Sequence, residues 1–258
     1  MRYDPSMSLV GSAAQAVLPP SIFRGIQMRR ARRTATKWLR SEGVINLGLR
    51  VAERFDYTVQ SGLFSGMRYT REAVVTRHAT PNLLGLYEDH LYPALSEAAQ
   101  RAEIIIDIGS AEGYFAVGLA KLTRKPVYAF DVNKVERMIL RGMARANGVE
   151  DLLTISPWCS AQVLLKLASH RALIICDIEG GEFQLFDSGT IRALHGQAVV
   201  IELHGTPEQN SSIISQFGSR VISNDGRHAP PSSLSFLGED SARMASEYRE
   251  PQDWLVRL

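Results

Sequence analysis

The stretch that decides the fold is IIIDIGSAEGY, which occupies residues 104–114 of the 258-residue chain. Its three consecutive isoleucines predict a strand that is buried on both faces of a sheet. The two glycines that follow let the backbone turn sharply and approach a ligand closely before a helix begins at Tyr114. In doubly wound sheets, ligands lie outside the carboxyl ends of the strands, so this turn is a candidate ligand-binding loop.

Apolar strands alternate with helical stretches from about residue 80 onward. This pattern predicts an α/β fold: a doubly wound, mostly parallel seven-stranded sheet with helices on both faces. The expected strands are Glu103–Ile108, Pro126–Phe130, Leu152–Ser156, Ala172–Cys176, Ala198–Leu203, Arg220–Ser223 and Trp254–Leu258. The expected helices are Leu83–Gln100, Tyr114–Leu122, Val135–Ala146, Ala161–Ala168, Gly181–Leu194 and Ser212–Phe217, and a surface loop is expected over Asn224–Ser235.

Residues 1–80 lack this alternation, and we expect them to form a basic, helical N-terminal extension that precedes a ligand-binding domain over residues 81–258. Residues 1–60 hold ten Lys and Arg against four Asp and Glu. A helix is expected over Ser21–Glu42, and its basic run at residues 28–33 favours a solvated helix face, with binding to phosphates or an anionic surface as the alternative. Because the positive charge is confined to this end, we expect no nucleic-acid partner.

The composition is that of a globular protein, with 45% hydrophobic and 22% charged residues. No run approaches the roughly 18 apolar residues that would span a bilayer, so no transmembrane segment is expected. Two cysteines, Cys159 and Cys176, exclude a disulfide framework and a zinc site made of cysteines alone. We therefore expect a cytoplasmic location.

The loop after the first strand favours one kind of nucleotide over another. Gly109 and Gly113 do not follow the G-x-G-x-x-G spacing of dinucleotide sites, and Glu112 would place negative charge beside a pyrophosphate. A ligand with an amino-acid end and no phosphate fits better, and S-adenosylmethionine is such a ligand. Asp131 ends the second strand, where its carboxylate can accept hydrogen bonds from a ribose diol.

At this point the chain resembles the class I S-adenosylmethionine-dependent methyltransferases, which have a Rossmann-like fold, and specifically their FkbM-like family. The resemblance is carried by LGLYE at 84–88, DIGSAEG at 107–113, YAFD at 128–131, ANGV at 146–149, CDIEGGE at 176–182 and VIELH at 200–204. It implies that one group of side chains and loop residues binds S-adenosylmethionine. These residues are Glu88, Asp107, Gly109, Ser110, Ala111, Glu112, Gly113, Asp131, Val132, Cys159, Ser160 and Asp177.

Within that group the resemblance implies a division of roles. The loop from Asp107 to Gly113 would cradle the methionine part of the cofactor, and Asp131 would hold the ribose hydroxyls. Val132 would lie beside the adenine, with Cys159 and Ser160 at the adenine edge.

The expected catalytic residues follow the fourth and fifth strands. Asp177 alternates with Glu179, and Glu202 with His204, so each pair shares one side of an extended chain. The resemblance makes the two strands neighbours, which would bring the four groups together. His204 is the expected general base, because an imidazole with a reference pKa of about 6.5 can be neutral in the cell. Asp177 is the alternative base.

We assign no metal site as the primary expectation, although the same carboxylates offer a second chemistry. A hard cation such as Mg²⁺, held by Asp177, Glu179 and Glu202, would lower the pKa of a coordinated hydroxyl.

The reaction implied by the resemblance is methyl transfer to an oxygen of a small molecule or glycan. N-methylation of a small amine or peptide is the first alternative, and a non-catalytic cofactor-binding protein is the second. The sequence leaves a homodimer open.

Overall fold

The computed structural model of the protein describes residues 43–76, 79–224, 226–246 and 252–258. The helix expected over Ser21–Glu42 and its basic run lie outside these residues. Residues Ile45–Leu258 form one compact unit. Of the helices that the structure describes, none combines the length and the apolar character needed to cross a membrane.

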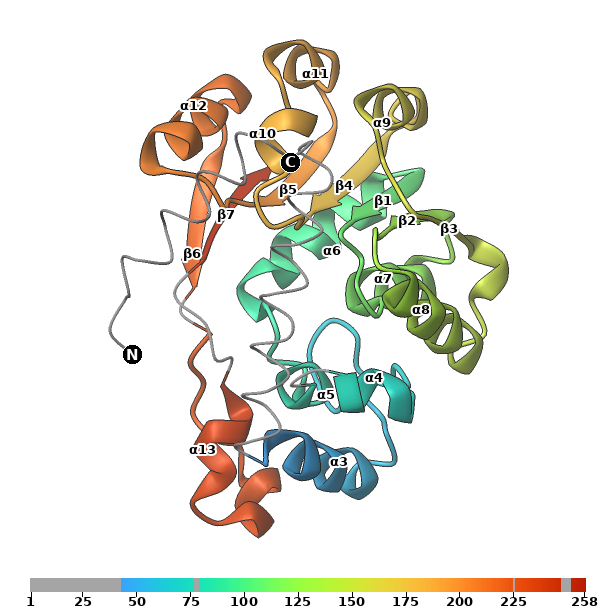
Figure 1. Cartoon of the computed structure of the whole chain (residues 1–258), viewed down its shortest axis with the longest axis vertical. Coiled ribbons are helices and arrows are strands. Elements are labelled where there is room, and N and C mark those ends of the chain that lie inside the picture. The colour runs from blue at the N-terminus through green and yellow to red at the C-terminus, as the bar shows by residue number, and fades with distance from the viewer. Residues whose placement is uncertain (1–42, 77–78, 225, 247–251) are drawn as a thin grey trace, which may run out of the picture. The chain divides into compact units, whose positions relative to one another are not determined.

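A seven-stranded sheet runs through this unit in the order β3-β2-β1-β4-β5-β7-β6 (Figure 1). The strands are β1 Ile104–Ile108, β2 Val127–Phe130, β3 Leu153–Ser156, β4 Ala172–Cys176, β5 Ala198–Glu202, β6 Arg220–Asn224 and β7 Gln252–Arg257. The first five pair in parallel, whereas β7 lies antiparallel between β5 and β6. The predicted doubly wound, mostly parallel sheet is confirmed. Its strand order reverses between β1 and β4, where such folds bind their ligands.

Helices cover both faces of the sheet. The helices are α3 Val44–Arg54, α4 Arg71–Thr76, α5 Thr80–Leu84, α6 Tyr92–Arg101, α7 Tyr114–Thr123, α8 Lys134–Ala146, α9 Ala161–Leu167, α10 Glu182–Leu185, α11 Ser188–Ala193, α12 Pro207–Phe217 and α13 Asp240–Ala245. Short 3-10 helices are η1 Asp89–Leu91, η2 Glu150–Leu152 and η3 Ser232–Leu237. Helices α9 to α12 lie on one face of the sheet and α6 to α8 on the other (Figure 1).

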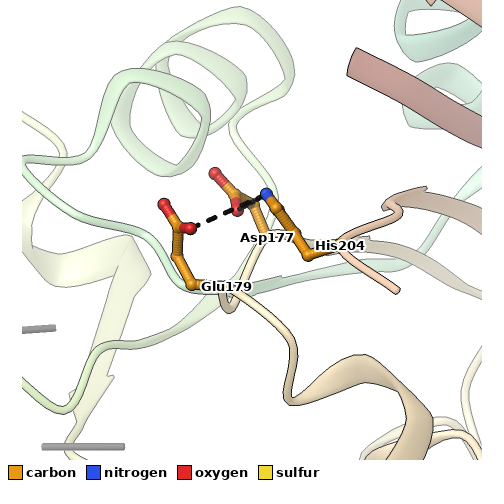
Figure 2. A group of neighbouring side chains, drawn as sticks. All are labelled: Asp177, Glu179 and His204. Carbon is orange, nitrogen blue, oxygen red and sulfur yellow. Dashed lines mark ion pairs between the residues drawn. The ribbon is translucent and has the colours of Figure 1, made fainter. Parts of the chain in front are cut away.

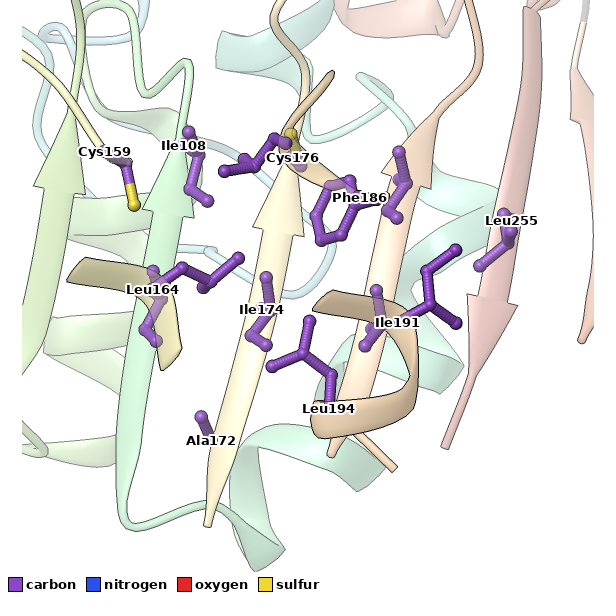
Figure 3. Close-up of a cluster of buried hydrophobic side chains, with 14 of the residues drawn as sticks. Ile108, Cys159, Leu164, Ala172, Ile174, Cys176, Phe186, Ile191, Leu194 and Leu255 are labelled. Atoms are coloured by element: carbon purple, nitrogen blue, oxygen red, sulfur yellow. The ribbon is translucent and has the colours of Figure 1, made fainter. Parts of the chain in front are cut away.

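One hydrophobic core cluster lies between the sheet and helices α9 to α12, and Figure 3 shows part of it against the strands. Every second residue of the central strands points into it, as Ile104, Ile106 and Ile108 do from β1. Leu164 on α9 and Ile191 on α11 pack against these strands. Ile105, which lies between Ile104 and Ile106 and points to the other face of the sheet, is also fully buried. Strand β1 is therefore covered on both faces, as its run of isoleucines predicted.

The prediction of a single helix over Leu83–Gln100 is wrong. Gly85 ends α5 with a φ of +76°, and a Cβ at this position would overlap the backbone carbonyl of Ser61. The chain then forms η1, and α6 begins at Tyr92 with Pro93 in its first turn. A glycine in the left-handed region stops a helix, and proline is favoured at the start of the next one.

The helix expected over Gly181–Leu194 is also two helices. Asp187 has extended backbone geometry between α10 and α11, and its carboxylate accepts a hydrogen bond of 2.7 Å from the N–H of Thr190. An aspartate that caps a helix in this way starts a new helix.

Two further boundaries in the C-terminal part differ from expectation. Helix α12 begins at Pro207, earlier than the expected Ser212, because Thr206 and Gln209 form a reciprocal capping box. The segment expected as a loop over Asn224–Ser235 includes the start of η3, which follows Pro231.

Residues 57–70 pack against the helices that follow β1 and β2. The backbone of Arg68 exchanges two hydrogen bonds with the Asn147 side chain, with N–O distances of 2.8 and 2.7 Å. The ring of Phe64 contacts the position of Gly118 on α7, where a Cβ would overlap it, and lies 5.0 Å from the Tyr114 ring centroid. This segment therefore supports the loop that connects β1 to α7.

Candidate active site

The loop between β1 and α7 depends on two glycines. Gly109 has a φ of +90° and Gly113 a φ of +98°, values that side chains rarely tolerate. A Cβ on Gly109 would overlap the carbonyl oxygen of Asp177, and one on Gly113 would overlap the side chain of Leu140. Only glycine therefore allows the loop after β1 to lie directly against the chain that leaves β4.

Asp131 fastens this loop from the end of β2. Its two carboxylate oxygens accept hydrogen bonds from the N–H groups of Ala111, at 3.0 Å, and Asn133, at 2.7 Å. The N–H groups of Gly109 and Ser110 donate to the carbonyl of Phe130, which adjoins Asp131. Asp131, the residue expected to bind the ribose, thus lies beside the loop, and each of its carboxylate oxygens keeps a further lone pair that can accept a hydrogen bond.

Asp107 is a buried carboxyl at the base of the loop. Burial and then the charge of Asp177 raise the pKa of Asp107 to about 8, although the N–H of Ala116 lowers it. Asp131 and Glu112 raise this pKa further. Among the described residues, its Oδ2 atom has no hydrogen-bond partner. The carboxyl is therefore mostly neutral at pH 7, and a nearby cation would favour its ionised form.

Two other residues expected to bind the cofactor contact protein groups. Glu112 is almost fully buried, and its Oε1 accepts a hydrogen bond of 3.3 Å from the hydroxyl of Tyr69. Glu88 is fully buried, with its Oε2 3.4 Å from Nδ1 of His90.

The residues expected around the adenine lie in different environments. Val132 is half exposed, whereas Ser160 caps α9 by accepting a hydrogen bond of 3.2 Å from the N–H of Val163. Cys159 belongs to the core cluster between the sheet and helices α9 to α12, and burial raises the pKa of its thiol to about 12. Its thiol is therefore neutral, and a contact with adenine stays a prediction.

The four expected catalytic residues come together at the ends of β4 and β5. Nε2 of His204 lies 3.6 Å from Oε1 of Glu202, 3.8 Å from Oδ1 of Asp177 and 3.9 Å from Oε2 of Glu179. Figure 2 shows the His204 ring pointing toward Asp177 and Glu179. Glu202 is nearly buried, whereas the Glu179 side chain is mostly exposed.

The charges around His204 change its titration and that of Asp177. Burial lowers the pKa of His204, but the hydrogen bond to Glu182 and the charges of Asp177, Glu182 and Glu179 outweigh it, and the pKa is raised above its ordinary 6.5. Burial raises the pKa of Asp177 to about 6, and the charge of His204 opposes this rise. The cluster can therefore take up or release a proton near neutral pH.

Glu182 is the site residue that sequence reasoning missed. Its carboxylate is fully buried, and its Oε1 lies 3.1 Å from Nδ1 of His204, on the side of the ring opposite the other carboxylates. The sequence carried a signal, since Glu182 belongs to the CDIEGGE stretch on which the family resemblance rests. Its position in a first helical turn concealed the contact with a residue 22 positions away.

A possible cation-binding set also lies in this cluster. Asp177, Glu179 and His204 each offer one ligand atom, and these atoms lie within 4.8 Å of one another. The set expected from the sequence included Glu202 instead of His204. The same arrangement suits His204 either as a general base or as a metal ligand, so metal binding stays an alternative that experiment must test.

Comparison with known proteins places the fold. No protein-family model and no curated protein matches the sequence. The structure is similar to the C-terminal domain of precorrin-6Y C5,15-methyltransferase from Rhodobacter capsulatus, with a TM-score of 0.50, 16% sequence identity, and coverage of 65% of this chain and 86% of that one. A precorrin-6Y C5,15-methyltransferase from Geobacter metallireducens gives a TM-score of 0.46 at 13% identity, with 66% and 88% covered.

At 16% identity, the similarity to the Rhodobacter capsulatus domain establishes the fold alone. Together with the strand order, it shows that the protein has the Rossmann-like fold of class I methyltransferases. Membership of the FkbM-like family stays a prediction from the sequence.

Proposed function

We propose that the protein is an S-adenosylmethionine-dependent methyltransferase that methylates an oxygen of a small molecule or glycan. The observation that carries this proposal is the direct contact between the glycine loop and the chain that bears the acid and base groups. Gly109 lies against the backbone carbonyl of Asp177, and Oδ1 of Asp177 lies 3.8 Å from Nε2 of His204. A ligand in the loop would therefore have its reactive end beside an imidazole.

The charge of the loop supports S-adenosylmethionine as the cofactor. Asp177, Asp131 and Glu112 are close enough to Asp107 for their charges to raise its pKa. Such an excess of carboxyls favours a ligand with ammonium and sulfonium cations, and it would repel a pyrophosphate. When bound, this cofactor supplies a methyl group on a positively charged sulfur that leaves as a neutral thioether.

His204 would act as the general base. In methyl transfer the acceptor oxygen would replace the sulfur on the methyl carbon, and Nε2 of His204 would take the hydroxyl proton. Glu202, Asp177 and Glu179 surround Nε2 and would stabilise the imidazolium that forms. Holding the oxygen in line with the breaking bond would provide the rest of the rate enhancement.

N-methylation is the second candidate, and the same carboxylates favour it. Three acidic groups around one nitrogen form a site that would also hold a cationic amine. That amine must lose a proton before it can attack the methyl carbon, so His204 would keep its role. The two candidates therefore differ in the acceptor and in the product.

The test combines purified full-length protein, S-adenosylmethionine with a labelled methyl group, and a panel of phenols, monosaccharides and primary amines. Label in an ether of a phenol or sugar supports O-methylation, and label in a methylamine replaces it with the second candidate. Calorimetry with S-adenosylmethionine and with NAD runs in parallel. Preferential binding of NAD contradicts the whole proposal, whereas tight binding of S-adenosylmethionine without transfer to any acceptor favours a non-catalytic binding protein.

A further inference from the structure

We propose that Glu182 is a positioning residue whose carboxylate holds His204 through Nδ1, so that the proton of the neutral ring lies on Nδ1 and the lone pair of Nε2 faces the reacting groups. This inference rests on the proposed function, because it defines how the expected base is aligned. It assigns a role to a residue that belongs to neither the expected cofactor-binding set nor the expected catalytic set.

The contacts of a single oxygen atom carry the argument. Oε1 of Glu182 accepts hydrogen bonds from the N–H groups of Ile178, at 3.1 Å, and Gly180, at 3.3 Å, and it lies 3.1 Å from Nδ1 of His204. An oxygen that already accepts two backbone N–H groups acts as an acceptor, so Nδ1 is the donor in the third contact. In a neutral imidazole a protonated Nδ1 leaves Nε2 as the acceptor.

The other side of the ring is arranged for an incoming proton. Nε2 faces Glu202, Asp177 and Glu179 at 3.6 to 3.9 Å, which is longer than a hydrogen bond. These three carboxylates and Glu182 are the ion-pair partners of His204 among the described residues, and they come from the ends of β4 and β5 and from α10. Within the part of the chain that the structure describes, Nε2 therefore makes no hydrogen bond to the protein, and its lone pair is left for an acceptor hydroxyl.

The same carboxylate also shapes the loop after β4. Glu179 has a φ of +55° and Gly180 a φ of +96°, so two successive residues lie in the left-handed region. This conformation is unfavourable for Glu179, and the bonds from Ile178 and Gly180 to Glu182 help to stabilise it. Glu182 thus fixes His204 and the segment that bears Asp177 and Glu179 in one arrangement.

The decisive experiment is nitrogen-15 NMR of the full chain with labelled histidine, at a pH at which His204 is neutral. The His204 signals are assigned by their loss in His204→Gln. We expect Nδ1 to carry the proton in the wild-type protein. In Glu182→Ala the ring should shift toward the Nε2–H form that an unconstrained imidazole prefers, whereas Glu182→Gln, whose amide oxygen can still accept, should keep the Nδ1–H form.

The matched control is Asp187→Asn, the same carboxylate-to-amide change on α11. Its side chain bonds the N–H of Thr190 and should leave the His204 tautomer unchanged. An Nε2–H ring in the wild-type protein, or the same tautomer in folded Glu182→Ala, overturns the proposal. If Glu182→Ala does not fold, the wild-type spectrum alone still decides.

Kinetics separate this inference from the proposed function. With any acceptor of the panel that is methylated, Glu182→Ala should lower kcat by about tenfold or more while the KM for S-adenosylmethionine stays unchanged. Methyl transfer by a protein whose His204 is in the Nε2–H form contradicts only the role of Glu182 and leaves the proposed function intact. An Nδ1–H ring without methyl transfer to any acceptor contradicts the proposed function and leaves the contact intact.

Discussion

Binding of S-adenosylmethionine should release a proton from Asp107, and the substitution Asp107→Asn should abolish that release. Burial, followed by the charge of Asp177, raises the pKa of Asp107 to about 8. A cation placed beside this carboxyl favours its ionised form, so the proton should leave when the cofactor binds.

The size of the effect follows from the pKa. With a value of about 8, roughly a tenth of the cofactor-free protein has an ionised Asp107 at pH 7, and roughly a hundredth has it at pH 6. If the bound cofactor keeps the carboxyl ionised, affinity should rise about ninefold between pH 6 and pH 7. About 0.9 proton should be released per cofactor bound at pH 7. An α-amino group, with a pKa of about 7.7 to 8.0, stays mostly charged in this range.

The assay is titration calorimetry at pH 6 and pH 7 in buffers of different ionisation enthalpy. The pKa of Asp177 is raised to about 6, so Asp177 also titrates in this window. The quantity that tests Asp107 is therefore the difference between the wild-type protein and Asp107→Asn. S-adenosylhomocysteine, which lacks the sulfonium charge, should release fewer protons than S-adenosylmethionine.

Two results would refute the reasoning. One is an equal number of released protons in the wild-type protein and in a folded Asp107→Asn variant. The other is a change in affinity between pH 6 and pH 7 that is the same in the wild-type protein and in Asp107→Asn. Either would mean that Asp107 does not meet the positive charge of the cofactor.

Four further predictions concern the catalytic groups and the loop. His204→Ala should lower turnover by about 10²- to 10⁴-fold with little change in cofactor affinity by calorimetry. Because the pKa of His204 is raised and the base form exists only above it, the wild-type rate should increase with pH through a midpoint above 6.5. A chelator should leave turnover unchanged; loss of activity that Mg²⁺ restores, together with loss of metal binding in Asp177→Asn, would replace the imidazole base with a metal. Gly109→Ala should reduce the free energy of unfolding, measured with urea, by more than about 2 kcal/mol, because the strained φ and the overlap with Asp177 act together. Gly148 has a φ of +62° and open space where a Cβ would lie, so Gly148→Ala should cost only about 1–2 kcal/mol. Equal losses in the two variants would contradict the packing argument.

Much of the sheet could be predicted because its signal is local. The run Ile104–Ile108 is apolar at every position except Asp107, and such runs are typical of strands that are covered on both faces. The position of Asp131 could be predicted for a similar reason, since it follows a short apolar strand directly. Helix boundaries were less predictable, because Gly85 and Asp187 end or start helices inside stretches with helical periodicity.

The candidate site was predictable only in part. Alternation along two strands paired Asp177 with Glu179 and Glu202 with His204, but it grouped all four only because the family resemblance made the two strands neighbours. It did not reveal Glu182, whose contact with His204 exists only because the chain after β4 turns back on itself through the left-handed conformations of Glu179 and Gly180. Contacts of this kind depend on a tertiary arrangement that no periodicity reports.

The packing of residues 57–70 has a practical consequence for protein production. A shortened chain that begins at residue 81, where the sequence suggested a domain start, would lack the Tyr69 hydroxyl that bonds Glu112 in the loop between β1 and α7. It would also lose the two hydrogen bonds that Arg68 makes with Asn147 at the end of α8 and would expose the surface of α7 that Phe64 covers. Expression for biochemical work should therefore retain at least the residues from Ile45 onward.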